Sequence, residues 1–201
     1  MQALQRYTRE DLRPTDDTGW LRLYGLLPQE WEGTVDDVLR LKDIPAHDRV
    51  WTVLHKRLVD DRVLRLFACA CVQKMIVPQY LESESVVSGQ SDLSLCESIL
   101  EICERYARGD ASKNELEAAR IFANHGSNVY LGHCFWLALE GATQPDAVTA
   151  ALIAVSMTAI SARLHAARHD DNESAEDSAD EQSWQFAAEK LLALLLEHQF
   201  D

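Results

Sequence analysis

The stretch from Asp61 to Val77, DRVLRLFACACVQKMIV, decides the fold. Its apolar residues recur at helical spacing and form one continuous stripe with two flanks: Leu64, Phe67, Cys71 and Met75, then Val63, Leu66, Ala70 and Ile76. Only four side chains are strongly polar, and three of them, Arg62, Arg65 and Gln73 but not Lys74, lie along one narrow strip. A helix that is apolar around most of its circumference is buried in a protein core. The stretch therefore predicts a central helix with other helices packed around it.

Apolar stripes on either side predict further helices, and no segment shows a convincing β-period. We expect helices over 34–44, 47–59, 92–108, 146–168 and 181–199. Residues 112–125 and 128–140 form either one helix kinked at Gly126 or two abutting helices. The sequence thus predicts an all-α, single-domain helical bundle of about six to eight helices.

Local signals place the ends of these helices. Thr34 with Asp37, and Ser112 with Glu115, have the spacing of capping boxes. Three further residues are expected N-caps, namely Asp60, Ser91 and Thr143. Pro78 is expected to stop the central helix, and Gly109 and Gly141 to end two others.

Residues 1–33 differ from the bundle domain, 34–201, in being irregular and rich in aromatic side chains. We interpret them as an N-terminal strap that docks on the helical body, since large apolar side chains are usually buried. The alternative is an exposed patch that meets a partner, or another subunit, with Trp20, Tyr24 and Trp31 as anchors.

The charge balance limits the choice of partners. The 201 residues include 19 basic and 33 acidic ones, which gives a net charge of −14. Such a field repels nucleic acid and anionic lipid and steers basic partners inward. We therefore expect a basic protein as the partner, with no direct DNA or RNA binding and no membrane association.

Location and redox state follow from simple features. The N-terminus lacks an apolar core of signal-peptide length, and we find no run of about 20 apolar residues to span a bilayer. The five cysteines are an odd number and lie mostly on apolar helical faces. Buried, reduced thiols in a cytoplasmic protein explain them better than disulfides do.

No sequence motif points firmly to catalysis. His133, His169 and Asp170 resemble the His and His-Asp pattern of helical metal-dependent phosphohydrolases. The His-Asp pair, however, lies where a helix runs into a charged loop, and no suitable helical Asp follows it. We expect neither a catalytic residue, a metal nor a cofactor, and we treat phosphoester hydrolysis as the enzymatic alternative.

Two groups of acidic residues are candidate partner contacts. Glu97, Glu101 and Glu104 share the outer face of one predicted helix. The stretch 170–181, predicted to be an acidic loop, carries the second group: Asp170, Asp171, Glu173, Glu176 and Asp177. Such residues serve either solubility or the capture of a basic protein surface.

Two segments resemble a known family. LRLFACACVQ at 64–73 and ERYARGDASKNELEAAR at 104–120 are similar to helical immunity proteins of bacterial toxin loci and to related uncharacterised domains of planctomycetes. The resemblance covers about residues 50–168, and the aromatic N-terminal strap departs from it. It implies a non-catalytic inhibitor that sequesters a toxin. A nucleic-acid-mimicking inhibitor from a mobile element is the alternative that the acidic charge suggests.

Overall fold

The computed structural model describes residues 5–14, 21–82, 89–129, 134–169 and 173–198. In chain order its elements are β1 (Tyr7–Thr8), the 3₁₀ helix η1 (Glu10–Leu12), α1 (Leu21–Leu26), β2 (Glu32–Gly33), α2 (Val35–Leu39), α3 (Ala46–His55), α4 (Asp61–Glu82), α5 (Gly89–Arg108), α6 (Lys113–Val129), α7 (Cys134–Ala142), α8 (Ala147–His169) and α9 (Glu173–His198).

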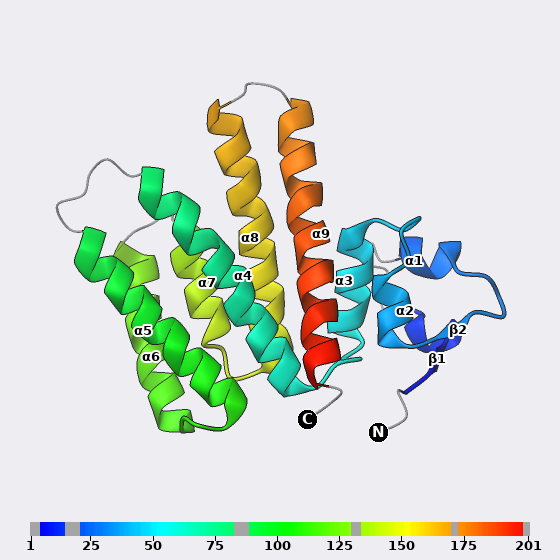
Figure 1. Cartoon of the computed structure of the whole chain (residues 1–201), viewed down its shortest axis with the longest axis horizontal. Coiled ribbons are helices and arrows are strands. Elements are labelled where there is room, and N and C mark those ends of the chain that lie inside the picture. The colour runs from blue at the N-terminus through cyan, green and yellow to red at the C-terminus, as the bar shows by residue number, and fades with distance from the viewer. Residues whose placement is uncertain (1–4, 15–20, 83–88, 130–133, 170–172, 199–201) are drawn as a thin grey trace.

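The prediction of an all-α, single-domain bundle is confirmed. The described residues form nine α-helices, one more than the upper end of the expected range. They also form a minimal antiparallel sheet that pairs Tyr7 with Gly33 and Thr8 with Glu32. Figure 1 shows α5 and α6 at one side of the molecule and the short N-terminal elements at the other, with α4, α8 and α9 between them.

The apolar helix α4 is central, as its sequence predicts. It packs against α5, α7, α8 and α9, and Leu64, Phe67 and Cys71 are fully buried. Asp60 caps it, because the Asp60 Oδ1 accepts the Val63 N–H at 2.9 Å. The expected stop at Pro78 is wrong, since α4 continues to Glu82. A proline inside a helix loses its own N–H bond and its ring crowds the carbonyl four residues earlier, but neither effect ended this long helix.

Both predicted capping boxes and the glycine at the end of α5 are confirmed. Thr34 and Asp37 form a capping box, and Ser112 and Glu115 exchange the same pair of bonds, at 2.8 Å and 3.2 Å. Gly109 follows α5 with φ of +85°, a conformation that favours glycine. Arg57, just after α3, also has positive φ, at +50°.

Two predicted N-caps are wrong. Thr143 instead donates its hydroxyl to the Glu140 carbonyl, and Asp146 caps α8 by accepting the Thr149 N–H at 2.8 Å. Both Thr143 and Asp146 have the right chemistry for a cap, so the backbone path decided between them. Ser91 lies inside α5, which begins at Gly89.

The predicted acidic loop is wrong from residue 173 onward, because α9 begins at Glu173. Acidic side chains are stabilised at a helix N-terminus, where the peptide dipoles leave positive charge. Arg163 of α8 also pairs with Glu176 across the hairpin, with 3.7 Å between Arg163 Nη2 and Glu176 Oε2. A dense run of carboxylates therefore begins a helix here.

The ambiguity at Gly126 resolves into two helices, with Gly126 inside α6 and α7 beginning at Cys134. The indole of Trp136 lies directly on this glycine, and a Cβ added to Gly126 would lie 2.2 Å from Trp136 Cε3. Glycine therefore lets α6 and α7 approach closely. On α6, Phe122 is exposed, while Ala119 and Ala123 are buried.

Helix α8 corrects the expectation about membrane-spanning segments. Its residues Ala147–Ala167 are long and apolar enough to cross a bilayer by length and composition. In the structure α8 packs against α4, α7 and α9, and its first half contributes Ala150, Ala154 and Val155 to the core. Core helices of this kind meet the same criterion.

Candidate functional site

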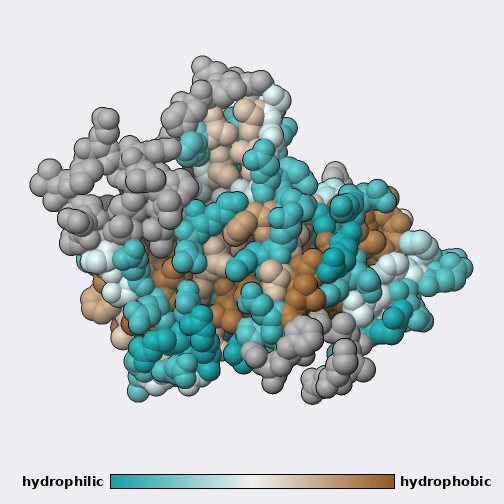
Figure 2. Space-filling view, in the orientation of Figure 1, coloured by the Kyte–Doolittle hydropathy of each residue, from teal (hydrophilic) through white to brown (hydrophobic). Residues whose placement is uncertain are grey.

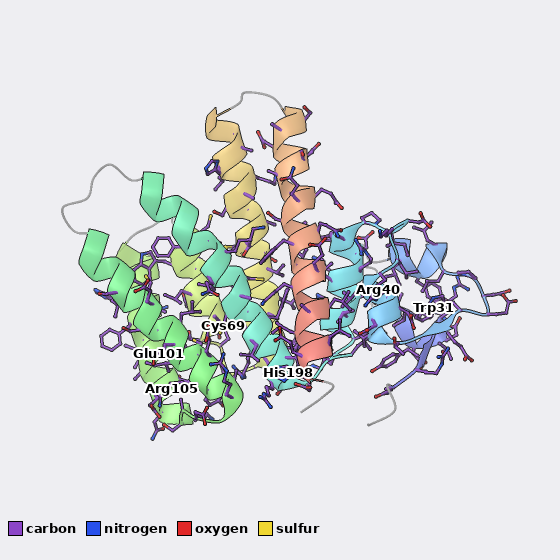
Figure 3. The ribbon with its side chains drawn as sticks, viewed as in Figure 1. Trp31, Arg40, Cys69, Glu101, Arg105 and His198 are labelled. Carbon is purple, nitrogen blue, oxygen red and sulfur yellow. The ribbon has the colours of Figure 1, made fainter. Side chains whose placement is uncertain are left out.

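The acidic residues of α5 face solvent at one edge of the molecule. Glu97 and Glu101 are exposed, whereas Glu104 is half-buried and accepts a hydrogen bond from Arg108 at 3.3 Å. Arg105 lies near Glu101 in Figure 3 but pairs with Glu115 of α6, at 3.2 Å. Glu97 and Glu101 are thus the α5 carboxylates best placed to meet a partner.

The second acidic group lies on α9. Asp177 is exposed, and Glu176 is half-buried beside Arg163. Asp170, Asp171 and the side chain of Glu173 lie outside the described part of the structure. In Figure 1 the start of α9 is far from α5, so the structure does not bring the two acidic groups together.

The aromatic candidates of the strap have partners within the chain. The hydroxyl of Tyr24 donates to Glu10 Oε1 at 2.7 Å, and the Arg9 guanidinium lies 4.2 Å from the Tyr24 ring centroid. Trp31 is half-buried and packs against the core. Trp20 lies outside the described residues. Leu12, Leu23 and Leu27 are buried, so the described parts of this segment dock on the body.

The helices α8 and α9 extend beyond the rest of the bundle as a hairpin (Figure 1). No residue from 160 to 167 or from 174 to 182 is buried, although both helices contribute to the core further down. We call these two segments the hairpin tip. The α9 side of the tip is acidic, and the α8 side carries the exposed apolar residues Ile160 and Leu164.

These exposed apolar residues are not among the candidate contacts named in the sequence analysis. Ile160 is 42% exposed and Leu164 is 48% exposed. A second exposed pair lies on α6, where Ile121 is 61% exposed and Phe122 57%. The buried stripe of α6 runs through Leu116, Ala119 and Ala123, and this phase alone would have placed Ile121 outside.

A buried arginine connects α3 to the start of the core-packed part of α9. Arg49 donates to the Leu39 carbonyl and to Gln185 Oε1, and Gln185 donates in turn to Glu189 Oε1 at 2.8 Å. Burial lowers the pKa of Arg49 from its usual value, and Glu181 and Glu189 oppose this shift. Helical periodicity relates residues within one helix, so it does not predict this contact between α3 and α9.

A shallow groove of about 430 Å³ lies beside this network. It is lined by Lys74, Glu181, Gln182, Gln185, Phe186 and Glu189. The Lys74 ammonium lies 3.8 Å from the centroid of the Phe186 ring, and burial lowers the pKa of this lysine. The groove brings together the Lys74 ammonium, the Phe186 ring and the carboxylates of Glu181 and Glu189. These groups do not surround one common point.

All five cysteines are buried free thiols, as predicted. A hydrogen bond with Cys103, together with burial, raises the pKa of Cys69 well above its usual range. Burial raises the pKa of Cys71 to about 12. Thiols in this state are protonated and poorly reactive at neutral pH.

The metal hypothesis stays untested, because its residues are not described in the structure. His133, Asp170 and the side chain of His169 lie outside the described residues. Within the described part of the chain, no three His, Cys, Asp or Glu side chains cluster as metal ligands.

Comparisons of the chain with protein-family models, with curated protein sequences and with solved structures find no match.

Proposed function

We propose that this protein is a non-catalytic acidic binding protein, an immunity-type inhibitor that sequesters a basic toxin or effector. Two points support the toxin as partner: the resemblance of residues 64–73 and 104–120 to immunity proteins, and a net charge of −14. A field of this sign accelerates the encounter with a basic protein and slows the encounter with nucleic acid.

The observation that carries the proposal is the acidic, solvent-exposed end of the hairpin. From Glu173 to Glu181, α9 holds five acidic residues and no lysine or arginine. The first four of them lie on the part of α9 that stands away from the body of the bundle (Figure 1), where a partner can approach them, whereas Glu181 lines the groove beside Lys74. Clustered carboxylates at a protruding end meet a basic surface before the rest of the molecule does.

Inhibition would be stoichiometric occlusion, in which the bound protein covers the active surface of the toxin. Exposed charges mainly raise the association rate, while tight binding needs apolar side chains that are buried on contact. The binding face therefore has to supply both kinds of residue.

Isothermal titration calorimetry against the product of the neighbouring gene tests the proposal. We expect one-to-one binding that weakens as salt is added, because exposed ion pairs are screened. An independent activity assay of that product should show inhibition at equal molar ratio. Absence of heat at micromolar concentrations, together with absence of inhibition, would contradict the proposal.

A further inference from the structure

We infer that Cys69 of α4 and Cys103 of α5 form a redox modification site, in which a low-molecular-weight disulfide oxidises the two thiols to one intramolecular disulfide. The inference goes beyond the proposed function and does not depend on it, because it follows from the packing of α4 on α5. The free thiols seen in the structure are then the reduced form of the site.

The hairpin of α4 and α5 places the two cysteines opposite each other. The two helices are neighbours that run in opposite directions (Figure 1), and they pack together. Their register is given by the Arg65 guanidinium, which lies 4.9 Å from the centroid of the Tyr106 ring. Cys69 follows Arg65 by four residues, and Cys103 precedes Tyr106 by three. The two thiols therefore meet one helical turn beyond this contact.

A direct contact between the two side chains agrees with this register. A hydrogen bond joins the thiols of Cys69 and Cys103, and each residue is 2% exposed. Helix axes that pack about 8–10 Å apart, with Cα atoms about 2.3 Å from each axis, leave facing Cα atoms about 3.4–5.4 Å apart. Disulfides have Cα separations of about 4.4–6.8 Å, which overlaps this range. A bond between the two sulfurs thus fits the packing of the helices.

The other cysteines are placed differently. Cys71 lies two residues from Cys69, so its side chain points to another side of α4, where its thiol hydrogen-bonds to Thr158 of α8. Cys96 lies seven residues from Cys103, which is about 10.5 Å along α5. The structure therefore predicts one specific disulfide, between α4 and α5.

Burial decides when oxidation can occur. A thiol attacks a disulfide as the thiolate, and the shared hydrogen bond and burial raise the pKa of Cys69. Figure 2 shows mainly hydrophilic residues at the lower left, where α5 lies, and the two buried thiols do not reach this surface. The reaction therefore passes through brief local separations of α5 from α4 that admit water and the oxidant.

Two exchange steps balance the reaction. In the opened form, the thiolate of one cysteine attacks a sulfur of the small disulfide RSSR, which gives a mixed disulfide and, after protonation, one RSH. The thiolate of the second cysteine then attacks the protein sulfur of the mixed disulfide and releases the second RSH. The protein loses two electrons and two protons, and RSSR gains them. The product joins α5 covalently to the central helix.

Peptide mapping of the full chain after oxidation by oxidised glutathione, without denaturant, tests the inference. The remaining thiols are alkylated in denaturant before digestion. Trypsin places the five cysteines on three peptides: Cys69 and Cys71 on 66–74, Cys96 and Cys103 on 75–105, and Cys134 on 121–163. We expect the first two peptides to be linked, and fragmentation in the mass spectrometer to assign the bond to Cys69 and Cys103.

The variants Cys69→Ala and Cys103→Ala should lose the link. Their matched controls are Cys71→Ala and Cys96→Ala, each on the same tryptic peptide as a test cysteine, and both should keep it. In the parent protein, oxidation should also raise the urea midpoint of unfolding by about 1 M, since the disulfide restrains the unfolded chain between residues 34 positions apart. Reduction with dithiothreitol should reverse this shift.

Three results would overturn the inference. The first is a bond through Cys71, Cys96 or Cys134 in place of the predicted pair. The second is a parent protein whose thiols stay free, or carry only glutathione, after oxidation. The third is a link that forms between two molecules, seen as a dimer on a non-reducing gel. Because fragmentation identifies the bond in the parent protein, the test does not depend on the folding of any variant.

Discussion

Replacement of Gly126 by alanine tests the contact between α6 and α7 most directly. In an open helix interior this change is stabilising by about 1 kcal/mol, because alanine has the higher helix propensity. Here the added Cβ would lie 2.2, 2.3 and 2.6 Å from three atoms of the Trp136 indole. The helix propensity of alanine and its packing at this site therefore act in opposite directions.

The magnitude follows from the depth of the overlap. Non-bonded carbon atoms pack at about 3.5–4.0 Å, so the Cβ would intrude by more than about 1 Å. The indole cannot swing away easily, since Trp136 is buried and its ring also contacts Phe135. Overpacking of this kind costs about 1–3 kcal/mol. With the upper end of that range and the propensity gain subtracted, we expect a net loss of about 2 kcal/mol.

Urea unfolding followed by far-ultraviolet circular dichroism gives the measurement. A loss of about 2 kcal/mol corresponds to a melting temperature about 4–8 °C lower for a chain of this size. Gly25→Ala in α1 is the matched control, because no atom lies within 4 Å of its added Cβ and no loss is expected.

A second background sharpens the test. In a Trp136→Ala variant the obstacle is gone, and Gly126→Ala should then stabilise by about 1 kcal/mol. The reversal of sign between the two backgrounds is the specific signature of the contact. If Gly126→Ala stabilises the otherwise unchanged protein, the packing of α6 on α7 described above is wrong.

Three further predictions concern stability. Arg65→Met should lower the free energy of unfolding by about 2 kcal/mol, because Arg65 donates to the Gln144 and Pro145 carbonyls from a buried position; urea unfolding checks it, and an unchanged midpoint would contradict it. Asp146→Ala should cost about 1 kcal/mol at pH 7. Its hydrogen bond to the Thr149 N–H lowers the pKa of Asp146, so the difference from the parent should shrink as pH falls through that depressed pKa; a difference independent of pH would argue against the cap. The pKa of Cys71 is about 12 in the folded protein against 9.0 in an open chain. The free energy of unfolding should therefore fall as pH rises between these two values, by about 1.4 kcal/mol per pH unit for this thiol. In Cys71→Ala the free energy of unfolding should fall less steeply over this pH range, and an identical slope would refute the assignment.

The sequence predicted the central apolar helix and both capping boxes correctly. The stripe of α4 and the Ser112–Glu115 capping box depend on residues at fixed short spacing, and both are confirmed. The predicted helix end at Pro78 was wrong because a proline is a local signal, whereas the length of α4 also depends on the contacts of the whole helix. The carboxylates after residue 172 were misread because composition alone does not show where a helix begins.

The candidate site was only partly accessible to sequence reasoning. Glu176 and Asp177, which the sequence analysis names as candidate contacts in a loop, lie on the helix α9. Ile160 and Leu164 continue the apolar pattern of a core helix, so nothing in the sequence separates them from Val155. What exposes them is the length of the hairpin relative to its neighbours, which depends on the arrangement of all the helices.

The contact between α3 and α9 has a consequence for how the chain acquires its structure during synthesis. Arg49 and Gln185 are 136 positions apart, yet the Arg49 guanidinium donates a hydrogen bond to Gln185 Oε1. When α3 leaves the ribosome, the surface that will cover its apolar side does not yet exist. The side of α3 that packs on α9 therefore stays uncovered until α9 has been made.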